Sequence, residues 1–359
     1  MRHLLSESVE SLSQWLKERG QPAYRAKQIF FWLLVRRAGG FDEMSDLPKG
    51  LRAELGQEFT IWSAKVATHS KAEDGTEKLL LELADRGRIE CVLLRDFERR
   101  TICISTQVGC AMGCVFCASG LDGVDRNLTK GEILEQMLLL QRLLPLDDRL
   151  SHIVVMGMGE PLANLDNLLP ALGEATRHDG LGISHRRITI STVGLPKAMA
   201  RLREHPIKYN LAVSLHAPND ALRTRIVPVN KNIGIGPILE EADLYFEASG
   251  RRLTYEYAML AGLNDAPQHA RELVQLLAPR NALLNVIPYN PVSGLPFETP
   301  REQAIAEFRG ILERGGVTVM FRKLKGDSIN AACGQLRRST PPTEVVQLAP
   351  PADAMPTAN

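Results

Sequence analysis

The sequence predicts an α/β protein built on a mostly parallel sheet that is either open or curled into a partial barrel. From residue 101 to about residue 336, short strand-like segments alternate with longer segments of helical periodicity. This alternation is typical of parallel sheets whose strands are joined by helices. The chain has 359 residues, 44% of them hydrophobic, which is enough for one large domain with an appendage or for two domains.

Two other regions precede this α/β part. Residues 8–60 place apolar side chains at helical spacing in "SLSQWLKERG" and "RAKQIFFWLLVRRAGG", and the pair Gly39-Gly40 is expected to end the second helix. "TEKLLLELADRGRIECVLLRDFERRTICIS" changes to the period of strands, with a turn near Gly87. We therefore expect a helical accessory domain over 1–75, a β extension over 76–100, the α/β part over 101–338 and a disordered, proline-rich tail over 339–359.

The α/β part contains six strand candidates in sequence. They are "HIVVMG", "RITISTVG", "YNLAVSLHA", "LTYEYAML", "LLNVIPYN" and "VTVMFRK". Helices such as "TKGEILEQMLLLQRLL" and "APQHARELVQLLA" are expected between them. In folds of this kind the functional groups gather at the carboxyl ends of the strands, so we expect the active site there.

Composition excludes several classes of protein. The formal net charge of +1 gives no global basic field, so any nucleic-acid binding would depend on local patches. No segment approaches the ~18 apolar residues of a membrane span, and the N-terminus does not resemble a signal peptide. We expect a cytoplasmic protein without membrane contact. Six cysteines in such a protein favour metal binding or catalysis over structural disulfides.

Three cysteines lie together in "GCAMGCVFCASG", with the spacing C-x3-C-x2-C. Cys110, Cys114 and Cys117 have no fourth cysteine or histidine nearby, whereas a structural zinc site takes four ligands. Three thiolates suit a 4Fe-4S cluster with one iron left open for a small molecule. A zinc site with a distant fourth ligand, or three buried cysteines without a special role, remain alternatives on spacing alone.

Polar residues follow several of the apolar strands directly. "VVMGMGEPL" ends in a glycine-rich turn with an acid, and the other strands end similarly. The candidates for a cofactor pocket are Gly159, Glu160, Ser191, Ser214, His216 and Asn290. Any one of these residues alone could simply be a polar residue at the end of a strand, and His216 could have only a structural hydrogen bond. Together with the cysteine loop, they predict one pocket.

The cysteine spacing resembles the signature of radical S-adenosylmethionine (SAM) enzymes. The chain as a whole resembles the RlmN-type methyltransferases, through "YRAKQIFFWLLVRRAGGFDEMSDLP", "CISTQVGCAMGCVFCASG", "RNLTKGEI", "GMGEPLANLDN", "SLHAPND", "IPYNP" and "AACGQL". The resemblance implies a partial (β/α)6 radical-SAM barrel with a small N-terminal helical, RNA-binding accessory domain and a short β extension. It also implies a 4Fe-4S cluster held by Cys110, Cys114 and Cys117, and SAM as cofactor.

The resemblance further implies a mechanism and its residues. Cys333, in "KGDSINAACGQL", would carry the methyl group as S-methylcysteine, and a 5′-deoxyadenosyl radical would activate it. Cys103 would form a transient disulfide with Cys333, and Glu90 would accept the proton. By itself Glu90 is only an acid in a strand, and each of these cysteines could be a small buried side chain; Cys91 stays unassigned. The implied SAM contacts are Gly159, Glu160, Ser191, Ser214, Leu215, His216 and Asn290.

The implied substrates are RNAs. The family methylates C2 of an adenine at the peptidyl-transferase centre of 23S rRNA and of the adenine at position 37 of tRNA. Basic runs that could contact RNA are 185–187, 251–252, 321–325 and 337–338. An electron donor such as flavodoxin or ferredoxin and a monomeric state are also expected. A Cfr-type enzyme acting on C8 of the same rRNA adenine is one alternative, and a non-catalytic RNA-binding protein with a structural metal is another.

Overall fold

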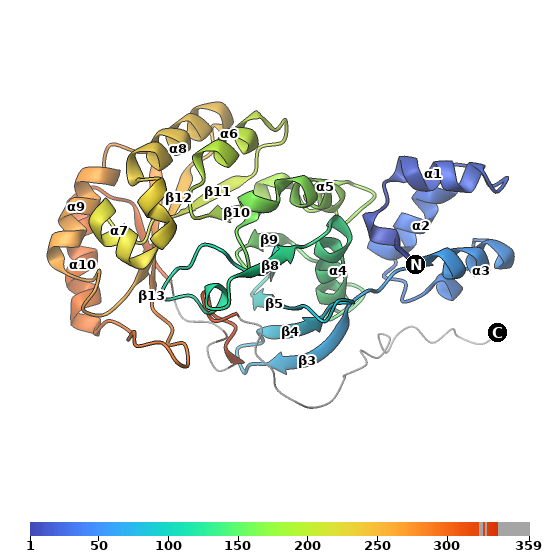
Figure 1. Ribbon diagram of the computed structural model, residues 1–359, viewed down its shortest axis with the longest axis horizontal. Coiled ribbons are helices and arrows are strands. Elements are labelled where there is room, and N and C mark those ends of the chain that lie inside the picture. The colour runs from blue at the N-terminus through green and yellow to red at the C-terminus, as the bar shows by residue number, and fades with distance from the viewer. Residues whose placement is uncertain (323–325, 327–328, 337–359) are drawn as a thin grey trace.

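The computed structural model of the chain describes residues 1–322, 326 and 329–336. The expected tail and part of the basic run at 321–325 lie outside these residues, as does the run at 337–338. Within the described part, one sheet of ten strands runs in the order β14-β13-β12-β11-β10-β9-β6-β5-β4-β3. Figure 1 shows this sheet curled, with helices along its outer side and the three N-terminal helices set apart from it.

The sheet has a parallel part and an antiparallel part. The parallel strands are β6 (Arg99–Cys103), β9 (His152–Val155), β10 (Ile188–Thr192), β11 (Asn210–Ser214), β12 (Leu253–Met259), β13 (Ala282–Pro288) and β14 (Val319–Phe321). The antiparallel strands are β3 (Lys65–Lys71), β4 (Glu77–Glu82) and β5 (Arg88–Asp96). Because β5 pairs with β6, the β extension continues the barrel sheet directly. The expected partial barrel is therefore confirmed.

Short strand pairs and 3-10 helices complete the connections. The remaining strands are β1 (Arg2–His3), β2 (Phe59–Thr60), β7 (Gln107–Gly109) and β8 (Val124–Asn127). The 3-10 helices are η1 (Leu4–Ser6), η2 (Phe41–Glu43), η3 (Ala118–Gly120), η4 (Pro161–Asn164), η5 (His185–Arg187) and η6 (Pro228–Asn232). The β7–β8 pair brackets the cysteine loop and fixes both of its ends.

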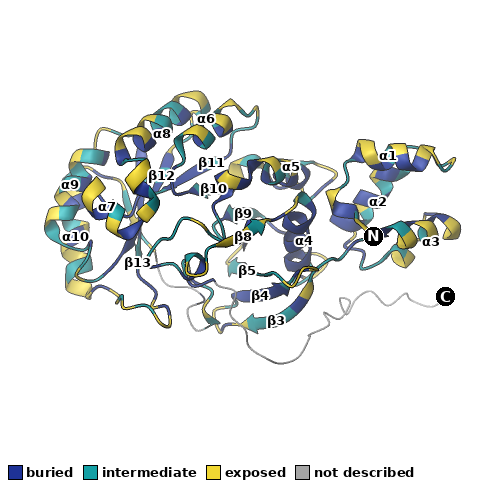
Figure 2. Cartoon of the chain, in the orientation of Figure 1, coloured by how far each residue is buried: buried dark blue, intermediate teal, exposed yellow. Residues whose placement is uncertain are grey.

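Helices cover the outer face of the sheet. They are α4 (Lys130–Gln141), α5 (Leu165–Thr176), α6 (Pro196–Glu204), α7 (Asp220–Ile226), α8 (Ile235–Ser249), α9 (Pro267–Leu277) and α10 (Glu302–Arg314). α4 begins with a capping box between Thr129 and Glu132, which satisfies two free backbone amides. Figure 2 shows that α4 is buried nearly all round, whereas the outer helices expose one side to solvent.

The N-terminal region is built from α1 (Val9–Lys17), α2 (Arg25–Leu34) and α3 (Lys49–Glu58). α2 ends before it reaches the glycine pair that was expected to stop it. Arg37 takes the left-handed conformation there, with φ of 58°. Its guanidinium donates hydrogen bonds to the backbone oxygens of Leu144 and Pro145, at 2.9 and 2.8 Å, just beyond α4. These bonds attach the N-terminal helices to the barrel.

The described part of the chain contains no helix with both the length and the apolar character that a membrane crossing requires.

Candidate active site

A pocket opens at the carboxyl ends of the parallel strands, where the sequence predicted the site. It encloses about 930 Å³, counting its open mouth. The predicted site residues that line it are Cys110, Cys114, Cys117, Gly159, Glu160, Ser191, Ser214, His216, Asn290 and Cys333. Leu215, Cys103 and Glu90 are outside this lining. Leu215 is fully buried because it points to the opposite side from Ser214 and His216, as alternation along the chain requires.

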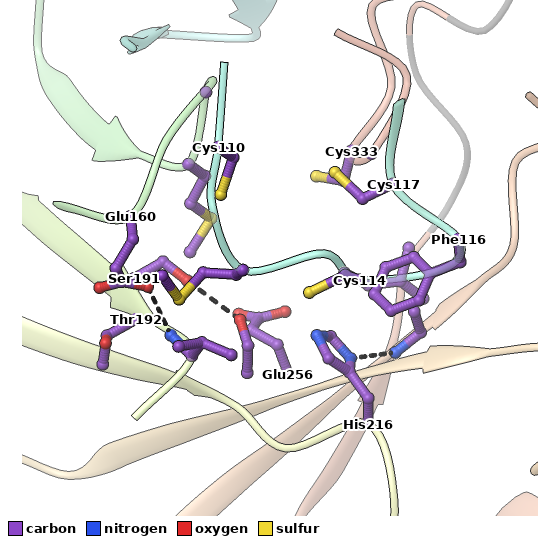
Figure 3. Close-up of a pocket in the computed structure, with 18 of the residues that line it drawn as sticks. Cys110, Cys114, Phe116, Cys117, Glu160, Ser191, Thr192, His216, Glu256 and Cys333 are labelled. Carbon is purple, nitrogen blue, oxygen red and sulfur yellow. Dashed lines mark hydrogen bonds between the residues drawn. The ribbon is translucent and has the colours of Figure 1, made fainter. Parts of the chain in front are cut away.

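The cysteine loop is fixed by backbone hydrogen bonds at several points. The amide of Cys110 donates to the oxygen of Gly123 at 2.8 Å, and the amide of Val115 donates to that of Ile226 at 3.0 Å. Gly113 has φ of 65°, which lets the loop reverse between the first two cysteines without steric cost. Figure 3 shows Cys110, Cys114 and Cys117 placed around the same space in the pocket.

The chemistry of these thiols fits an iron–sulfur cluster. Burial raises the pKa of Cys110 to about 11 and that of Cys114 well above its usual range, so without metal they are protonated thiols. A bound cluster would deprotonate them, because only thiolates ligate iron. In the described part of the chain, no three His, Cys, Asp or Glu side chains are placed to share one metal ion. The three cysteine side chains surround a space in the pocket, as a cluster of several irons requires, instead of converging on the position of a single metal ion.

The turn after β9 brings its backbone unusually close to the start of the cysteine loop. Gly159 has φ of +99°, and a Cβ added there would lie 2.6 Å from Cβ of Gln107. A Cβ on Gly157 would lie 2.6 Å from Oγ of Ser105. Neither position can hold a side chain without displacing its neighbours, so both glycines are required by the packing.

Glu160 follows this turn and is held rigidly. Its carboxylate accepts hydrogen bonds from the amides of Val193, at 2.8 Å, and Leu162, at 3.0 Å. Burial raises its pKa, and these amides oppose the rise. Glu160 lines the pocket, and a carboxylate with lone pairs left after two hydrogen bonds could accept from a ligand ammonium.

The next two strands present hydroxyl groups and a neutral imidazole. Ser191 Oγ and Ser214 Oγ lie 3.4 Å apart at the ends of β10 and β11. His216 accepts a hydrogen bond from the amide of Ala258 at 3.0 Å, and Phe116 packs against its ring edge. Burial lowers the pKa of His216 to about 3, and the Arg223 guanidinium contributes. His216 is therefore a neutral wall of the pocket.

Asn290 provides an open hydrogen-bonding group. It is 3% exposed and lines the pocket, yet its Oδ1 has no hydrogen-bond partner among the described residues. A buried amide oxygen without a partner costs free energy, which a polar ligand would recover. The pocket therefore has carboxylate, hydroxyl and amide groups suited to an amino acid or nucleoside beside a thiol-lined space. These groups fit SAM and a cluster.

Cys333 is brought to the pocket by contacts with the cysteine loop. The amide of Ala118 donates to the oxygen of Gly334 at 2.8 Å, and Ser119 Oγ donates to that of Leu336 at 2.6 Å. Figure 3 shows Cys333 on the side of the pocket where Cys117 lies. Cys333 is exposed at this mouth, and its Sγ lies 3.9 Å from Nη1 of Arg322.

Cys103 and Glu90 lie behind this loop on the sheet. Cys103 ends β6, and burial together with the nearby Cys333 thiol raises its pKa to about 12, so it is a thiol in the resting protein. Glu90 lies on β5, where its Oε1 is 2.7 Å from Nζ of Lys78. Both are therefore next to the Cys333 loop but are not part of the main pocket.

Sequence reasoning missed two charged residues in and beside the site, Glu256 and Arg223, and named a third, Arg322, only as part of the basic run 321–325. Glu256 on β12 is buried in the pocket wall, accepts from Nδ2 of Asn285 at 2.6 Å, and has a pKa raised by burial. Arg223 is fully buried and donates to the oxygens of Leu215 and Ser214. An acid inside the apolar strand "LTYEYAML" was a signal for Glu256. Arg223 had no comparable signal, and the basic run gave no sign that Arg322 would lie beside Cys333, because both placements depend on the folded chain.

Two of the basic runs named as possible RNA contacts lie at the end of the barrel opposite the pocket. Arg186 and Arg187 directly precede β10, and Arg251 and Arg252 directly precede β12. Arg251 also donates to Asn210 Oδ1 at 3.2 Å, at the start of β11. In a parallel sheet these positions are at the amino ends of the strands, opposite the pocket. Neither run is therefore next to the pocket.

The fold and the thiol-lined pocket define a radical SAM enzyme, and residues 104–276 match the model of the radical SAM superfamily. Residues 3–61 match the model described as the ribosomal RNA large subunit methyltransferase N-terminal domain. A radical SAM methyltransferase from Sphaerobacter thermophilus has a similar structure, with a TM-score of 0.91 and 39% identity over 94% of this chain and 100% of that chain.

Similar curated proteins identify the family within the radical SAM superfamily. A probable dual-specificity RNA methyltransferase RlmN of Rhodopirellula baltica is 65% identical over 94% of this chain and 91% of its own length. A probable dual-specificity RNA methyltransferase RlmN of Thermosynechococcus vestitus is 44% identical over 94% of this chain and 98% of its own length. The chain belongs to the RlmN family of radical SAM RNA methyltransferases. Membership implies a 4Fe-4S cluster and SAM as its cofactors, and it confirms the family that the motifs indicated.

Proposed function

We propose that this enzyme methylates C2 of an adenine at the peptidyl-transferase centre of 23S rRNA and of the adenine at position 37 of tRNA. The observation that carries the proposal is the attachment of the Cys333 loop to the cysteine loop through Ala118 and Ser119. It places a thiol that is not a predicted cluster ligand at the mouth of the cofactor pocket. The relatives named dual-specificity RNA methyltransferase support both substrates.

Each cofactor has a proposed set of protein groups. Cys110, Cys114 and Cys117 would hold the cluster, leaving its fourth iron to SAM. Gly159, Glu160, Ser191, Ser214, Leu215, His216 and Asn290 would contact SAM, with Leu215 contributing only backbone atoms because its side chain is buried away from the pocket. When bound, the cluster and SAM together supply a methyl group and a 5′-deoxyadenosyl radical.

The thiols and Glu90 carry the methyl transfer in this proposal. Cys333 takes the methyl group on sulfur, and after hydrogen abstraction its methylene carbon adds to C2 of the adenine. The adduct would give up its C2 proton to Glu90 and one electron to the oxidised cluster, which supplied one electron for the cleavage of SAM. Cys103 then forms a disulfide with Cys333, so the carbon–sulfur bond breaks and the released carbon takes a proton to become methyl. Reduction of the disulfide, by a donor such as flavodoxin or ferredoxin or by another thiol, completes the cycle.

Substitution of the cysteines tests this assignment. Cys333→Ala should abolish adenine methylation, because no carrier sulfur remains. Cys103→Ala should leave RNA covalently bound to the protein, because the carbon–sulfur bond is not cleaved. Cys91→Ala is the matched control, since Cys91 is buried and has no assigned role. Full methylation by Cys333→Ala, measured by mass spectrometry of digested RNA, would refute the carrier.

If Glu90 accepts a proton from the target base, the phosphates next to that base need basic groups on the face of the sheet that carries Glu90. A second cavity, at the turn between β4 and β5, is lined by Lys65, Arg86 and Arg88 together with Glu82. Arg88 and Glu90 are two residues apart on β5 and so point to the same face. We infer that phosphates next to the target base contact this cavity. The accessory region, expected over 1–75, is helical only as far as Glu58, because Lys65–Lys71 forms β3 of the main sheet, and we infer that its helices also bind RNA. The enzyme would act as a cytoplasmic monomer.

A further inference from the structure

A buried lysine connects Glu90 to the loop that carries Cys333. Lys78 Nζ lies 2.7 Å from Oε1 of Glu90 and 3.1 Å from the backbone oxygen of Asn330, three residues before Cys333. We propose that Lys78 is a positioning residue, which holds the proton acceptor Glu90 and the loop that carries Cys333 in a fixed arrangement relative to each other. The inference depends on the roles proposed above for Glu90 and Cys333.

The register of the β extension places Lys78 on the reacting side of the sheet. Lys78 pairs with Val92 across β4 and β5, and Val92 pairs with Cys103 across β5 and β6. Directly opposite residues in antiparallel strands share a face. Leu80 is two residues from Lys78 on β4 and therefore shares its face, and Leu80 pairs with Glu90. Glu90 is therefore on that face too. One row of side chains therefore runs from Lys78 to Cys103, with Glu90 beside it.

Two hydrogen bonds join the loop to the start of β4 and the turn before it, and Gly326 packs closely there. The amide of Gly326 donates to Oδ2 of Asp74 at 3.0 Å, and a Cβ on Gly326 would lie 2.9 Å from Cγ2 of Thr76. Of these two hydrogen bonds, the one from Lys78 to Asn330 is nearer to Cys333 along the chain. Asn330 itself has φ of 52°, so its carbonyl is directed by a tight local turn. Loss of the lysine would release the side of the loop nearest the carrier sulfur.

The chemistry of an ammonium group explains why a lysine suits this position. It has three N–H donors, of which one reaches a carboxylate and another a carbonyl. Both acceptors are needed, because Lys78 is only 8% exposed and a buried cation without partners is unfavourable. The ion pair with Lys78 also fixes the direction in which the Glu90 carboxylate points. It exchanges no proton or electron itself.

The first experiment follows single steps in the reconstituted holoenzyme. Lys78→Met should still acquire S-methylcysteine at Cys333, because that step does not use Glu90. Formation of methyladenine should fall by about 10- to 100-fold, as expected when an acid–base group is misplaced. RNA joined to the protein should accumulate on denaturing gels, as in Glu90→Gln. Lys71→Met, at an exposed lysine of the neighbouring strand β3, is the control and should behave as wild type.

The possible failures are distinguishable. If Lys78→Met matches Lys71→Met, or loses S-methylcysteine and methyladenine in parallel, Lys78 is not a positioning residue for the later step. If wild-type enzyme forms no methyladenine, the proposed function itself is wrong.

A second experiment covers the case in which Lys78→Met does not fold. The double variant Lys78→Met/Glu90→Gln removes both charges, so no buried charge is left unpaired. In cluster-free protein, Cys333 should react with iodoacetamide several-fold faster in this variant than in Glu90→Gln alone, because only the double variant loses the donor to Asn330. Equal rates would show that Lys78 does not hold the loop.

Discussion

At the scale of single residues, the pocket depends on a backbone position that accepts no side chain. Gly159 combines φ of +99° with an approach to Gln107 that leaves no room for a Cβ. The turn it makes presents Glu160 to the pocket, and the carboxylate is then fixed by the amides of Val193 and Leu162. The precise place of one acid is therefore set by a neighbouring glycine and by two backbone donors.

Replacement of this glycine should be costly. We expect Gly159→Ala to lower the free energy of unfolding by about 2 kcal/mol or more, from backbone strain and overlap with Gln107, and to weaken SAM binding. Gly173→Ala is the matched control, because Gly173 lies in α5 and a Cβ added there would meet nothing within 4 Å. That control should be neutral or stabilising. Urea unfolding of cluster-free protein measures both, and equal stabilities for the two variants would contradict the packing argument.

Single residues also show what the sequence could and could not predict. Strand-end residues such as Ser191, Ser214 and Asn290 were predictable, because the ends of parallel strands meet at one edge. Leu215 was placed among the SAM contacts by resemblance, although alternation turns its side chain away. Glu256 and Lys78 were missed, because whether an ionisable residue in a strand faces a pocket depends on register and on distant loops.

At the scale of elements, α4 connects the barrel to the N-terminal region through a buried acid. Glu135 accepts hydrogen bonds from the amides of Ser63 and Ala64, at 2.9 and 2.8 Å, in the segment that leads into β3. Burial nevertheless raises the pKa of Glu135 to about 7. The helix thus holds a carboxyl group that changes its charge near neutral pH.

This acid makes stability depend on pH in a defined direction. A carboxyl group whose pKa is higher in the folded state stabilises that state fully below its unfolded pKa near 4.5, and this contribution is lost as pH rises through about 7. From pH 5 to pH 8 it should cost roughly 2 kcal/mol of unfolding free energy. Glu135→Gln should remove that dependence, and Glu54→Gln, at an exposed residue of α3, should keep it. Chemical denaturation at both pH values tests this; parallel profiles for Glu135→Gln and wild type would count against it.

At the scale of the whole molecule, charge is distributed locally around an almost neutral chain. The net charge of +1 cannot attract RNA by itself. The basic cavity of Lys65, Arg86 and Arg88 lies on the face of the β extension that carries Glu90. The runs before β10 and β12, at the other end of the barrel, do not share this position. The RNA contacts proposed above therefore lie on one side of the sheet.

This separation predicts a difference in salt dependence. Arg86→Asn removes a charge while keeping a residue that tolerates the left-handed backbone, φ of 68°, at this position. It should weaken RNA binding and reduce the slope of log affinity against log salt by about 1. Arg187→Gln, at the opposite end, should leave both unchanged. Fluorescence anisotropy with an rRNA fragment measures the slopes, and the reverse pattern would place the RNA elsewhere.

The central claim is that this pocket and the Cys333 carrier methylate adenine at C2. The most direct measurement is nucleoside mass spectrometry, against synthetic standards, of 23S rRNA and tRNA fragments treated with anaerobically reconstituted enzyme, SAM and a reductant. We predict 2-methyladenosine in both RNAs, and none with Cys333→Ala. Formation of 8-methyladenosine instead, or of methylated RNA without Cys333, would contradict the account.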